Sequence, residues 1–248
     1  MKSKKIKPRF NKEQNPRIGL IALATDFMIE KDFIQIIKDK KIDFFVNRIQ
    51  SYNPLTKENL IKMSDKVTEV TKNILPDEDI DCVVYGCTSG TIAAGYDVIE
   101  KKVLAAKPNT KLTTPSSAVI KALKKLKIKK LAIFTPYSKT LNDEILKYFS
   151  GEGFIINSNS YLDISSDIDI GKVEQKFLYD VLSKIEMKEA DALFISCTAL
   201  PVLNIIDRLE KKIKKPVLSS NQALIWDSLE AIRRNEEVRG FGKLFEIN

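Results

Sequence analysis

The sequence contains no histidine among its 248 residues. This absence excludes a Ser-His-Asp triad, a Cys-His pair and a histidine-ligated metal site. Proton transfer near neutral pH would therefore depend on cysteine, tyrosine, lysine or a carboxylate with a shifted pKa. Cysteine is scarce as well, because the chain has only Cys82, Cys87 and Cys197. So few cysteines argue against a disulfide framework.

Long apolar segments are also lacking. No run approaches the roughly 18 apolar residues that a membrane span needs, and the basic N-terminus lacks the apolar centre of a signal peptide. With 44% hydrophobic and 30% charged residues, the composition is typical of a soluble globular protein. We therefore expect a cytoplasmic protein without membrane contact.

The net charge of +8 is the one feature that points to a nucleic-acid partner. Part of it lies in residues 1–16, which we expect to form a basic flexible arm, and another part lies between Lys121 and Lys130. Lysines at this density are more typical of a solvated helix face, and they can attract anionic substrates. We expect no nucleic-acid partner; the alternative, binding through the arm, predicts a strongly salt-dependent affinity.

Two segments of the chain share one plan. Asp81 and Asp191 each begin an apolar run that ends, six residues later, in a cysteine followed by threonine, at Cys87 and Cys197. A Glu-Lys-Lys sequence begins thirteen residues after each of these cysteines. We infer that one unit occurs twice, with its first strands near residues 17 and 130.

Short apolar runs alternate with amphipathic stretches, as is typical of parallel sheets flanked by helices. The expected strands are 18–24, 43–49, 81–86, 111–113, 131–135, 154–158, 192–196 and 216–219. The expected helices include 60–74, 92–106, 141–149, 177–185 and 202–212. The prediction is an α/β fold with two Rossmann-like lobes, residues 17–114 plus 219–248 in the N-terminal lobe and 115–218 in the C-terminal lobe.

The repeated cysteines predict a site between the lobes. Ligands of open parallel sheets bind beyond the carboxyl ends of the strands, and Cys87 and Cys197 both follow the third strand of their copy. Two facing lobes would bring both sulfurs to one cleft. Opposed thiols can remove a proton from one face of a carbon and return it to the other without a cofactor. Cys82 lies inside a strand and is expected to be a packing residue.

Both catalytic candidates are expected to precede a helix. Cys87 comes before the stretch 92–106 and Cys197 before 202–212, where N–H groups and the helix dipole would favour a thiolate. The hydroxyls expected to hold a substrate carboxylate are those of Thr88, Ser89, Thr91 and Thr198.

The loops after the first strands supply two more candidates. Tyr137 could bind a carboxylate or donate a proton, and a packed tyrosine is the alternative. Asp26 would repel a second substrate carboxylate and attract an ammonium group; an N-cap for a helix beginning near Phe27 is the alternative.

At these residues the chain resembles the aspartate/glutamate racemase superfamily, in the branch with maleate cis-trans isomerases, arylmalonate decarboxylases and the ectoine-utilisation proteins. The resemblance rests on residues 17–21, 85–90, 135–138 and 196–201, and extends to Ser165-Ser166-Asp167. It implies lobes related by pseudo-twofold symmetry, Cys87 and Cys197 as the catalytic pair, and no cofactor or metal. It also allows a homo-oligomer.

One departure affects the expected substrate. Maleate isomerases place an asparagine in the first loop, whereas Thr25-Asp26-Phe27 with Glu30 resembles the ectoine-utilisation proteins most closely. This similarity implies an amino-bearing substrate, such as a diamino acid or an ectoine-derived compound.

The favoured function is a cofactor-independent racemase or isomerase of a small amino acid or carboxylate, with Cys87 and Cys197 as acid and base. Three alternatives stay open. They are a maleate-type cis-trans isomerase acting through a covalent Cys87 adduct, an arylmalonate-type decarboxylase, and a small-molecule-binding protein without catalysis. The presence of both cysteines disfavours simple decarboxylation.

Overall fold

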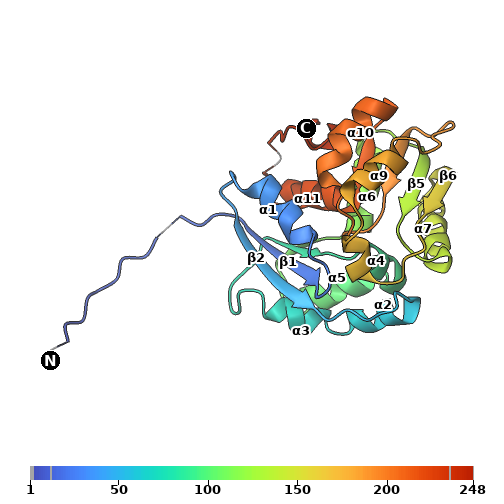
Figure 1. Ribbon diagram of the computed structural model, residues 1–248. Coiled ribbons are helices and arrows are strands. Elements are labelled where there is room, and N and C mark those ends of the chain that lie inside the picture. Colours follow the sequence, from blue (N-terminus) through green and yellow to red (C-terminus); the bar gives the residue numbers. More distant parts are fainter. Residues whose placement is uncertain (1–2, 12, 235, 248) are drawn as a thin grey trace.

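The computed structural model describes residues 3–11, 13–234 and 236–247, and it contains two parallel sheets flanked by helices (Figure 1). The first four-stranded sheet has the order β2-β1-β3-β4 and the second β6-β5-β7-β8. The strands are β1 (Arg17–Leu23), β2 (Asp43–Ile49), β3 (Cys82–Tyr85), β4 (Lys111–Thr113), β5 (Lys130–Thr135), β6 (Ile155–Tyr161), β7 (Ala192–Ile195) and β8 (Val217–Ser219). The predicted fold class and all eight predicted strands are confirmed.

The two sheets repeat the same pairing. In each, the first strand of the copy lies between the second and the third, and the third pairs with the fourth. Ile21 pairs with Tyr85 in the first sheet, and Phe134 pairs with Ile195 in the second. The residues that follow β3 and β7 therefore leave their sheets at equivalent positions.

The helices are α1 (Ile29–Ile37), α2 (Lys57–Ser64), α3 (Val67–Lys72), α4 (Thr88–Ala94), α5 (Tyr96–Leu104), α6 (Pro115–Lys125), α7 (Lys139–Gly151), α8 (Asp167–Gly171), α9 (Gln175–Leu182), α10 (Ile206–Ile213) and α11 (Ser220–Ala231). Two short 3₁₀ helices are η1 (Leu203–Ile205) and η2 (Lys243–Glu246).

Two of the predicted helices are interrupted. The stretch 60–74 divides into α2 and α3 because the N–H of Asp65 turns back to the carbonyl of Lys62, which tightens the last turn. The stretch 92–106 divides at Gly95, whose φ of +89° suits glycine and ends α4. The amphipathic pattern continues through both breaks, so the pattern alone did not predict them.

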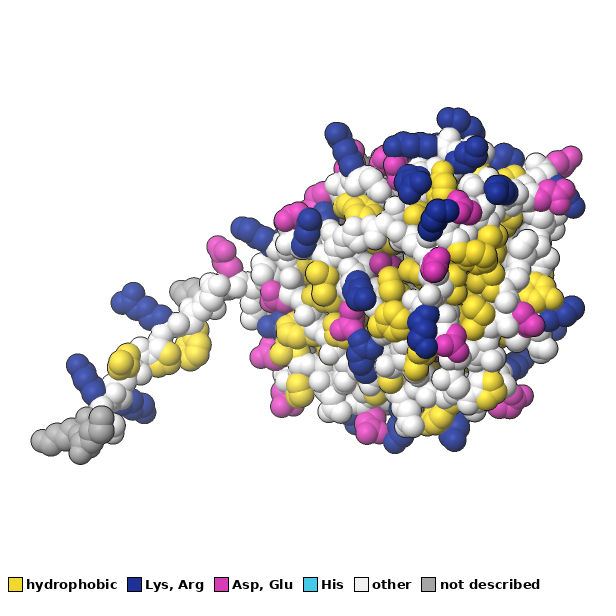
Figure 2. Space-filling model, viewed as in Figure 1, with side chains coloured by type: hydrophobic (Ala, Val, Ile, Leu, Met, Phe, Trp, Pro, Cys, Tyr) yellow, Lys and Arg dark blue, Asp and Glu magenta, His cyan; other side chains and the backbone are white. Residues whose placement is uncertain are grey.

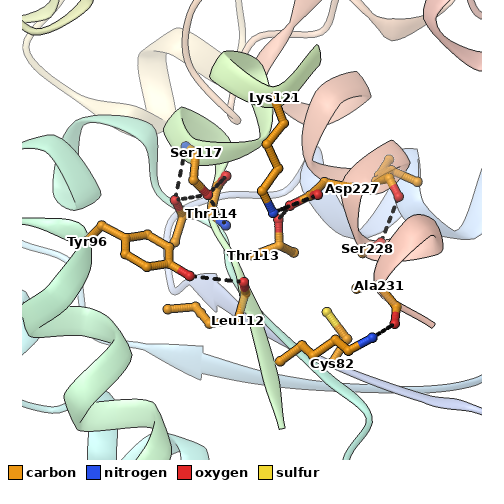
Figure 3. Close-up of polar contacts among 12 residues, drawn as sticks. Cys82, Tyr96, Leu112, Thr113, Thr114, Ser117, Lys121, Asp227, Ser228 and Ala231 are labelled. Carbon is orange, nitrogen blue, oxygen red and sulfur yellow. Dashed lines mark hydrogen bonds and ion pairs between the residues drawn. The ribbon is translucent and has the colours of Figure 1, made fainter. Parts of the chain in front are cut away.

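Helices α6 and α11 both begin directly after a fourth strand. Thr114 is the N-cap of α6 and forms a capping box with Ser117 (Figure 3). Ser219 is the N-cap of α11 and forms a capping box with Gln222. The two helices pack against each other, and α11 also contacts α1, β3 and β4. Assignment of residues 219–248 to the N-terminal lobe stays a prediction, with these contacts in its favour.

Residues 3–11 and 13–16 run away from the body of the molecule ahead of β1 (Figure 1). On the face shown in Figure 2, Lys and Arg side chains are interspersed with Asp and Glu. None of the helices described here has the length and apolar character needed to cross a bilayer.

Candidate active site

Hydrogen bonds join the loops that carry the two cysteines. The N–H of Cys197 and the hydroxyl of Thr88 both donate to Ser220 Oγ, at 3.0 and 2.9 Å. The hydroxyl of Thr198 donates to the carbonyl of Gly86 at 3.3 Å. The carboxyl ends of β3 and β7 therefore lie together at the start of α11, as the topology predicts.

The two thiols share their surroundings. The residues Cys87 and Cys197 are only 3% and 4% exposed. The negative charges of Asp167 and Asp26 act on both thiols, and both sulfurs in turn act on the phenol of Tyr137. These common neighbours indicate that the two sulfurs lie in one enclosed region of the molecule.

Cys87 lies at a helix N-terminus, as predicted, but the helix begins four residues earlier than expected, so that Cys87 is the N-cap of α4. Its Sγ accepts the N–H of Gly90 at 3.2 Å, and Ser89 Oγ lies 3.9 Å from it. A side chain at Gly90 would place its Cβ 2.8 Å from this sulfur and 2.9 Å from Met63 Cε. Glycine is required here because the backbone of α4 approaches the thiol closely.

Cys197 has an unusual backbone conformation. It adopts a φ of +97°, in the left-handed region that residues with a side chain rarely occupy, and α10 begins only at Ile206. Residues 198–202 form a bent loop, and the following turn is the 3₁₀ helix η1. The helix expected over 202–212 is therefore present, but its first turn is 3₁₀ and residues 198–202 separate it from Cys197, whose backbone is held by the bond to Ser220.

The expected lowering of the thiol pKa is also not found. Burial raises the pKa of Cys87 to about 12, and the charge of Asp167 raises it further. The Gly90 N–H and the Ser89 hydroxyl favour the thiolate, but their effect is smaller than that of burial. Burial and Asp167 likewise hold the pKa of Cys197 well above its usual range. In the free protein both groups are thiols.

Alkylation of Cys87 by iodoacetamide is expected to accelerate about tenfold per pH unit between pH 7 and 10, without a plateau. With a pKa of about 12, the thiolate fraction at pH 7 is on the order of 10⁻⁵. Peptide mass spectrometry of time courses at each pH measures the rate. A plateau near pH 8 would show an ordinary thiol and contradict the burial argument.

The two carboxylate oxygens of Asp26 lie in different surroundings. Its Oδ1 accepts the N–H groups of Met28 at 2.8 Å and Ile29 at 3.0 Å, as an N-cap does. Its Oδ2 is buried and has no hydrogen-bond partner. Burial raises the pKa of this carboxyl. Asp26 therefore caps the turn that leads into α1, whose own N-cap is Met28, and its Oδ2 has no hydrogen-bond partner.

Two further buried aspartates were not predicted as site residues. Asp167, at the start of α8, accepts the Thr25 hydroxyl at 3.2 Å, and burial raises its pKa to about 6. Asp32, on α1, accepts Asn221 Nδ2 at 2.7 Å, and burial raises its pKa to about 7. A signal for Asp32 was present, because it lies on the apolar face of α1 with Ile29, Phe33 and Ile36.

The predicted hydroxyls are already engaged within the protein. Thr88 bonds Ser220, Thr91 donates to the Cys87 carbonyl at 2.7 Å, and Thr198 donates to Gly86. Each hydroxyl can still accept a hydrogen bond, but its only hydrogen is already donated within the protein. Tyr137 is 1% exposed and lies beside Cys197, so its phenol belongs to the enclosed region.

Cys82 lies apart from this pair. It is fully buried within β3, near a polar network in which Lys121 pairs with Asp227 at 3.0 Å and Thr113 bonds the same carboxylate (Figure 3). Burial raises the pKa of its thiol far above the usual range, and Asp227 contributes most of the charge effect. These surroundings fit the predicted packing role.

The segment around α8 crosses from the second sheet to loops of the first. The N–H of Leu55 donates to the Ser165 carbonyl at 3.0 Å, and Thr25 holds Asp167. The ring of Phe27 lies against Gly171, where an added Cβ would meet it at 2.6 Å. In the described part of the chain, no three or more His, Cys, Asp or Glu side chains converge as metal ligands.

A family model described as arylmalonate decarboxylase matches residues 35–245. The chain belongs to the arylmalonate decarboxylase family. Among its relatives, the maleate isomerase of Geobacillus stearothermophilus is 23% identical over 243 residues, covering 92% of this chain and 96% of that protein.

Solved structures show the same fold. The maleate isomerase of Pseudomonas putida S16 matches with a TM-score of 0.86 at 24% identity, covering 93% of this chain and 98% of that chain. A cysteine-to-serine mutant of the Nocardia farcinica maleate cis-trans isomerase, with a covalently bound succinylcysteine intermediate, matches with a TM-score of 0.85 at 20% identity, covering 94% and 99%. The predicted closeness of this family member to the ectoine-utilisation proteins stays a prediction.

Proposed function

We propose that the protein is a cofactor-independent isomerase that acts on a small amino acid or carboxylate, with Cys87 and Cys197 as its proton-transferring pair. This proposal rests on the common environment of the two thiols. Ser220 joins the loops that carry them, and Asp26, Asp167 and Tyr137 are neighbours of both sulfurs. The relatives named as isomerases support the reaction class.

In the proposed reaction, one cysteine is a thiolate when substrate is bound. It removes the proton from the carbon beside the substrate carboxylate, which leaves the electron pair on that carbon and a neutral thiol. The other cysteine then gives its proton to the opposite face of the carbon and becomes the thiolate. One carbon–hydrogen bond breaks and one forms, so the configuration inverts without an oxidant or a cofactor.

The hydroxyls around the pair would orient the substrate. In this proposal Ser89 and the phenol of Tyr137, beside both sulfurs, donate to the substrate carboxylate. Thr88, Thr91 and Thr198 join them when the bound carboxylate draws their hydroxyl hydrogens away from Ser220 and from the Cys87 and Gly86 carbonyls. Ser220 is a positioning residue, because it fixes the backbone of Cys197 and the side chain of Thr88.

A second candidate is suggested by the succinylcysteine in the Nocardia farcinica structure. Here the Cys87 thiolate adds to one carbon of a cis double bond, and the Cys197 thiol gives its proton to the neighbouring carbon. The central carbon–carbon bond rotates, that carbon returns a proton to Cys197, and the sulfur of Cys87 leaves to give the trans acid. The same residues serve both schemes, which differ in outcome: the first inverts a carbon centre and the second converts a cis double bond into a trans one.

A screen in D₂O separates the two. Amino acids and unsaturated dicarboxylates are incubated with the protein, and products are analysed by proton NMR and chiral chromatography. Inversion by the thiol pair is expected to place deuterium on the inverted carbon of the product. Conversion of a cis acid into its trans isomer would support the covalent scheme, and an inverted product without deuterium at the inverted carbon would contradict proton transfer.

A further inference from the structure

The acidic side chains around the thiols lack cationic partners. Among the residues that the structure describes, no Lys or Arg forms an ion pair with Asp26, Asp32 or Asp167. Arg48 is nearby, but its guanidinium pairs with Glu30 and donates to the backbone carbonyls of Leu23 and Asp26. A buried carboxylate without such a partner is costly, so its place here calls for a ligand that compensates it.

Two buried oxygen atoms in this region that can only accept, Asp26 Oδ2 and Asn221 Oδ1, have no donor. The hydroxyls of Tyr85 and Ser196 also lack partners, but each can donate as well as accept. The amide orientation of Asn221 is fixed by its Nδ2, which donates to Asp32 Oδ2 at 2.7 Å and to the Thr198 carbonyl at 2.8 Å. Reversal of the amide would face an oxygen against two acceptors. Both free atoms are therefore acceptors, and a ligand group that satisfies them must be a hydrogen-bond donor.

These acceptors lie beside the reacting atoms. The charges of Asp26 and Asp167 act on both Cys87 and Cys197, and the side chain of Thr198, in the Cys197 loop, lies beside Asp26. We propose that Asp26, Asp167 and Asn221 form a subsite for the ammonium group of the substrate. This inference rests on the proposed function and names the substrate class: a small zwitterion with an amino group on or next to the carbon between the sulfurs.

The proposed subsite also explains how a thiolate can form when substrate binds. The buried carboxylates oppose formation of a thiolate, whereas a bound ammonium neutralises part of their charge and favours it. The reactive form then arises when the correct substrate is bound. A dicarboxylate such as maleate would place its second carboxylate against Asp26 or Asp167 and is disfavoured.

Binding of four-carbon probes tests the subsite without turnover. Calorimetry at pH 8 compares 2-aminobutyrate and 3-aminobutyrate with two four-carbon acids that lack the amino group, butyrate and succinate. At least one amino compound is expected to bind about tenfold or more tightly than butyrate, and succinate most weakly. Equal or tighter binding of succinate would overturn the proposal, as would tighter binding of Mg²⁺ or Ca²⁺ than of either amine.

Substitution of each aspartate tests whether the amine binds at the proposed subsite. Asp26→Asn and Asp167→Asn are each expected to weaken the amine about tenfold or more and to improve binding of succinate, while the exposed Asp169→Asn on the same helix as Asp167 changes neither. Unchanged amine affinity in both variants would overturn the assignment. In the unmodified protein, amine affinity should fall as pH drops through about 6, where Asp167 gains a proton. These results stand even if the D₂O screen finds no turnover, so the two proposals fail separately.

Discussion

Replacement of Cys87 or Cys197 by serine is expected to lower turnover by a factor of at least about 10³, while the fold is retained. A serine hydroxyl in the same position cannot exchange protons at neutral pH, and removal of a positioned acid or base costs typically about 10² to 10⁴ in rate. At Cys87, serine is also a good N-cap, so α4 should persist. Steady-state kinetics with the substrate from the D₂O screen, together with circular dichroism melting curves, measures both effects.

Cys82→Ala supplies the matched control. This cysteine is fully buried in β3, away from the pair, so the variant should keep its activity and lose only a little stability. Full activity in either Cys87→Ser or Cys197→Ser would remove the two-thiol mechanism. Loss of activity in Cys82→Ala with an intact fold would show that the site is placed wrongly.

Asp32→Asn is expected to stabilise the protein at pH 8 by about 2–4 kcal/mol. Burial raises the pKa of Asp32 from its usual value to about 7, and each tenfold change in proton affinity corresponds to about 1.4 kcal/mol. The folded state therefore binds the extra proton between about pH 4 and pH 7. The associated stability is present at acidic pH and is lost as pH rises through 7. The side chain introduced by Asp32→Asn is neutral at every pH, so the variant does not lose this stability as the pH rises.

Urea unfolding at pH 5 and pH 8 measures the effect. The gain from Asp32→Asn at pH 5 should be only about a third of the gain at pH 8, whereas the exposed Asp39→Asn should alter stability little at either pH. Destabilisation of Asp32→Asn at pH 8 would mean that the ionised carboxylate is well compensated in the free protein. A stabilising replacement next to the site is the pattern expected of a residue retained for function.

The eight strands were predictable because each is a short apolar run and the second copy repeats the first, whereas their order of pairing was known only from the structure. The joined cysteine loops followed from that repeat, since equivalent strands end at the same edge of their sheets. The helix breaks at Gly95 and at Asp65 were harder to predict from the sequence. They depend on single backbone turns, and the amphipathic pattern continues across both.

The chemistry of the site was harder to predict than its position. Cys87 does cap α4, but whether a capped thiol ionises depends on burial, which the sequence does not show. Asp32 and Asp167 were not identified as site residues because their roles arise from contacts with Asn221 and Thr25, which are 189 and 142 residues away in the chain. Cys197 adopts its unusual backbone through a bond to Ser220, also from a distant segment.

Labelling stoichiometry tests the central claim, that Cys87 and Cys197 open into the same small space. The protein is treated with iodoacetamide at pH 9, and intact-mass and peptide mass spectrometry count the labels on each cysteine. A group attached to one sulfur should fill the space and block the other, so the account predicts about one label per folded chain, shared between the two cysteines. Chains that carry labels on Cys87 and Cys197 together, each added at its own independent rate, would contradict it.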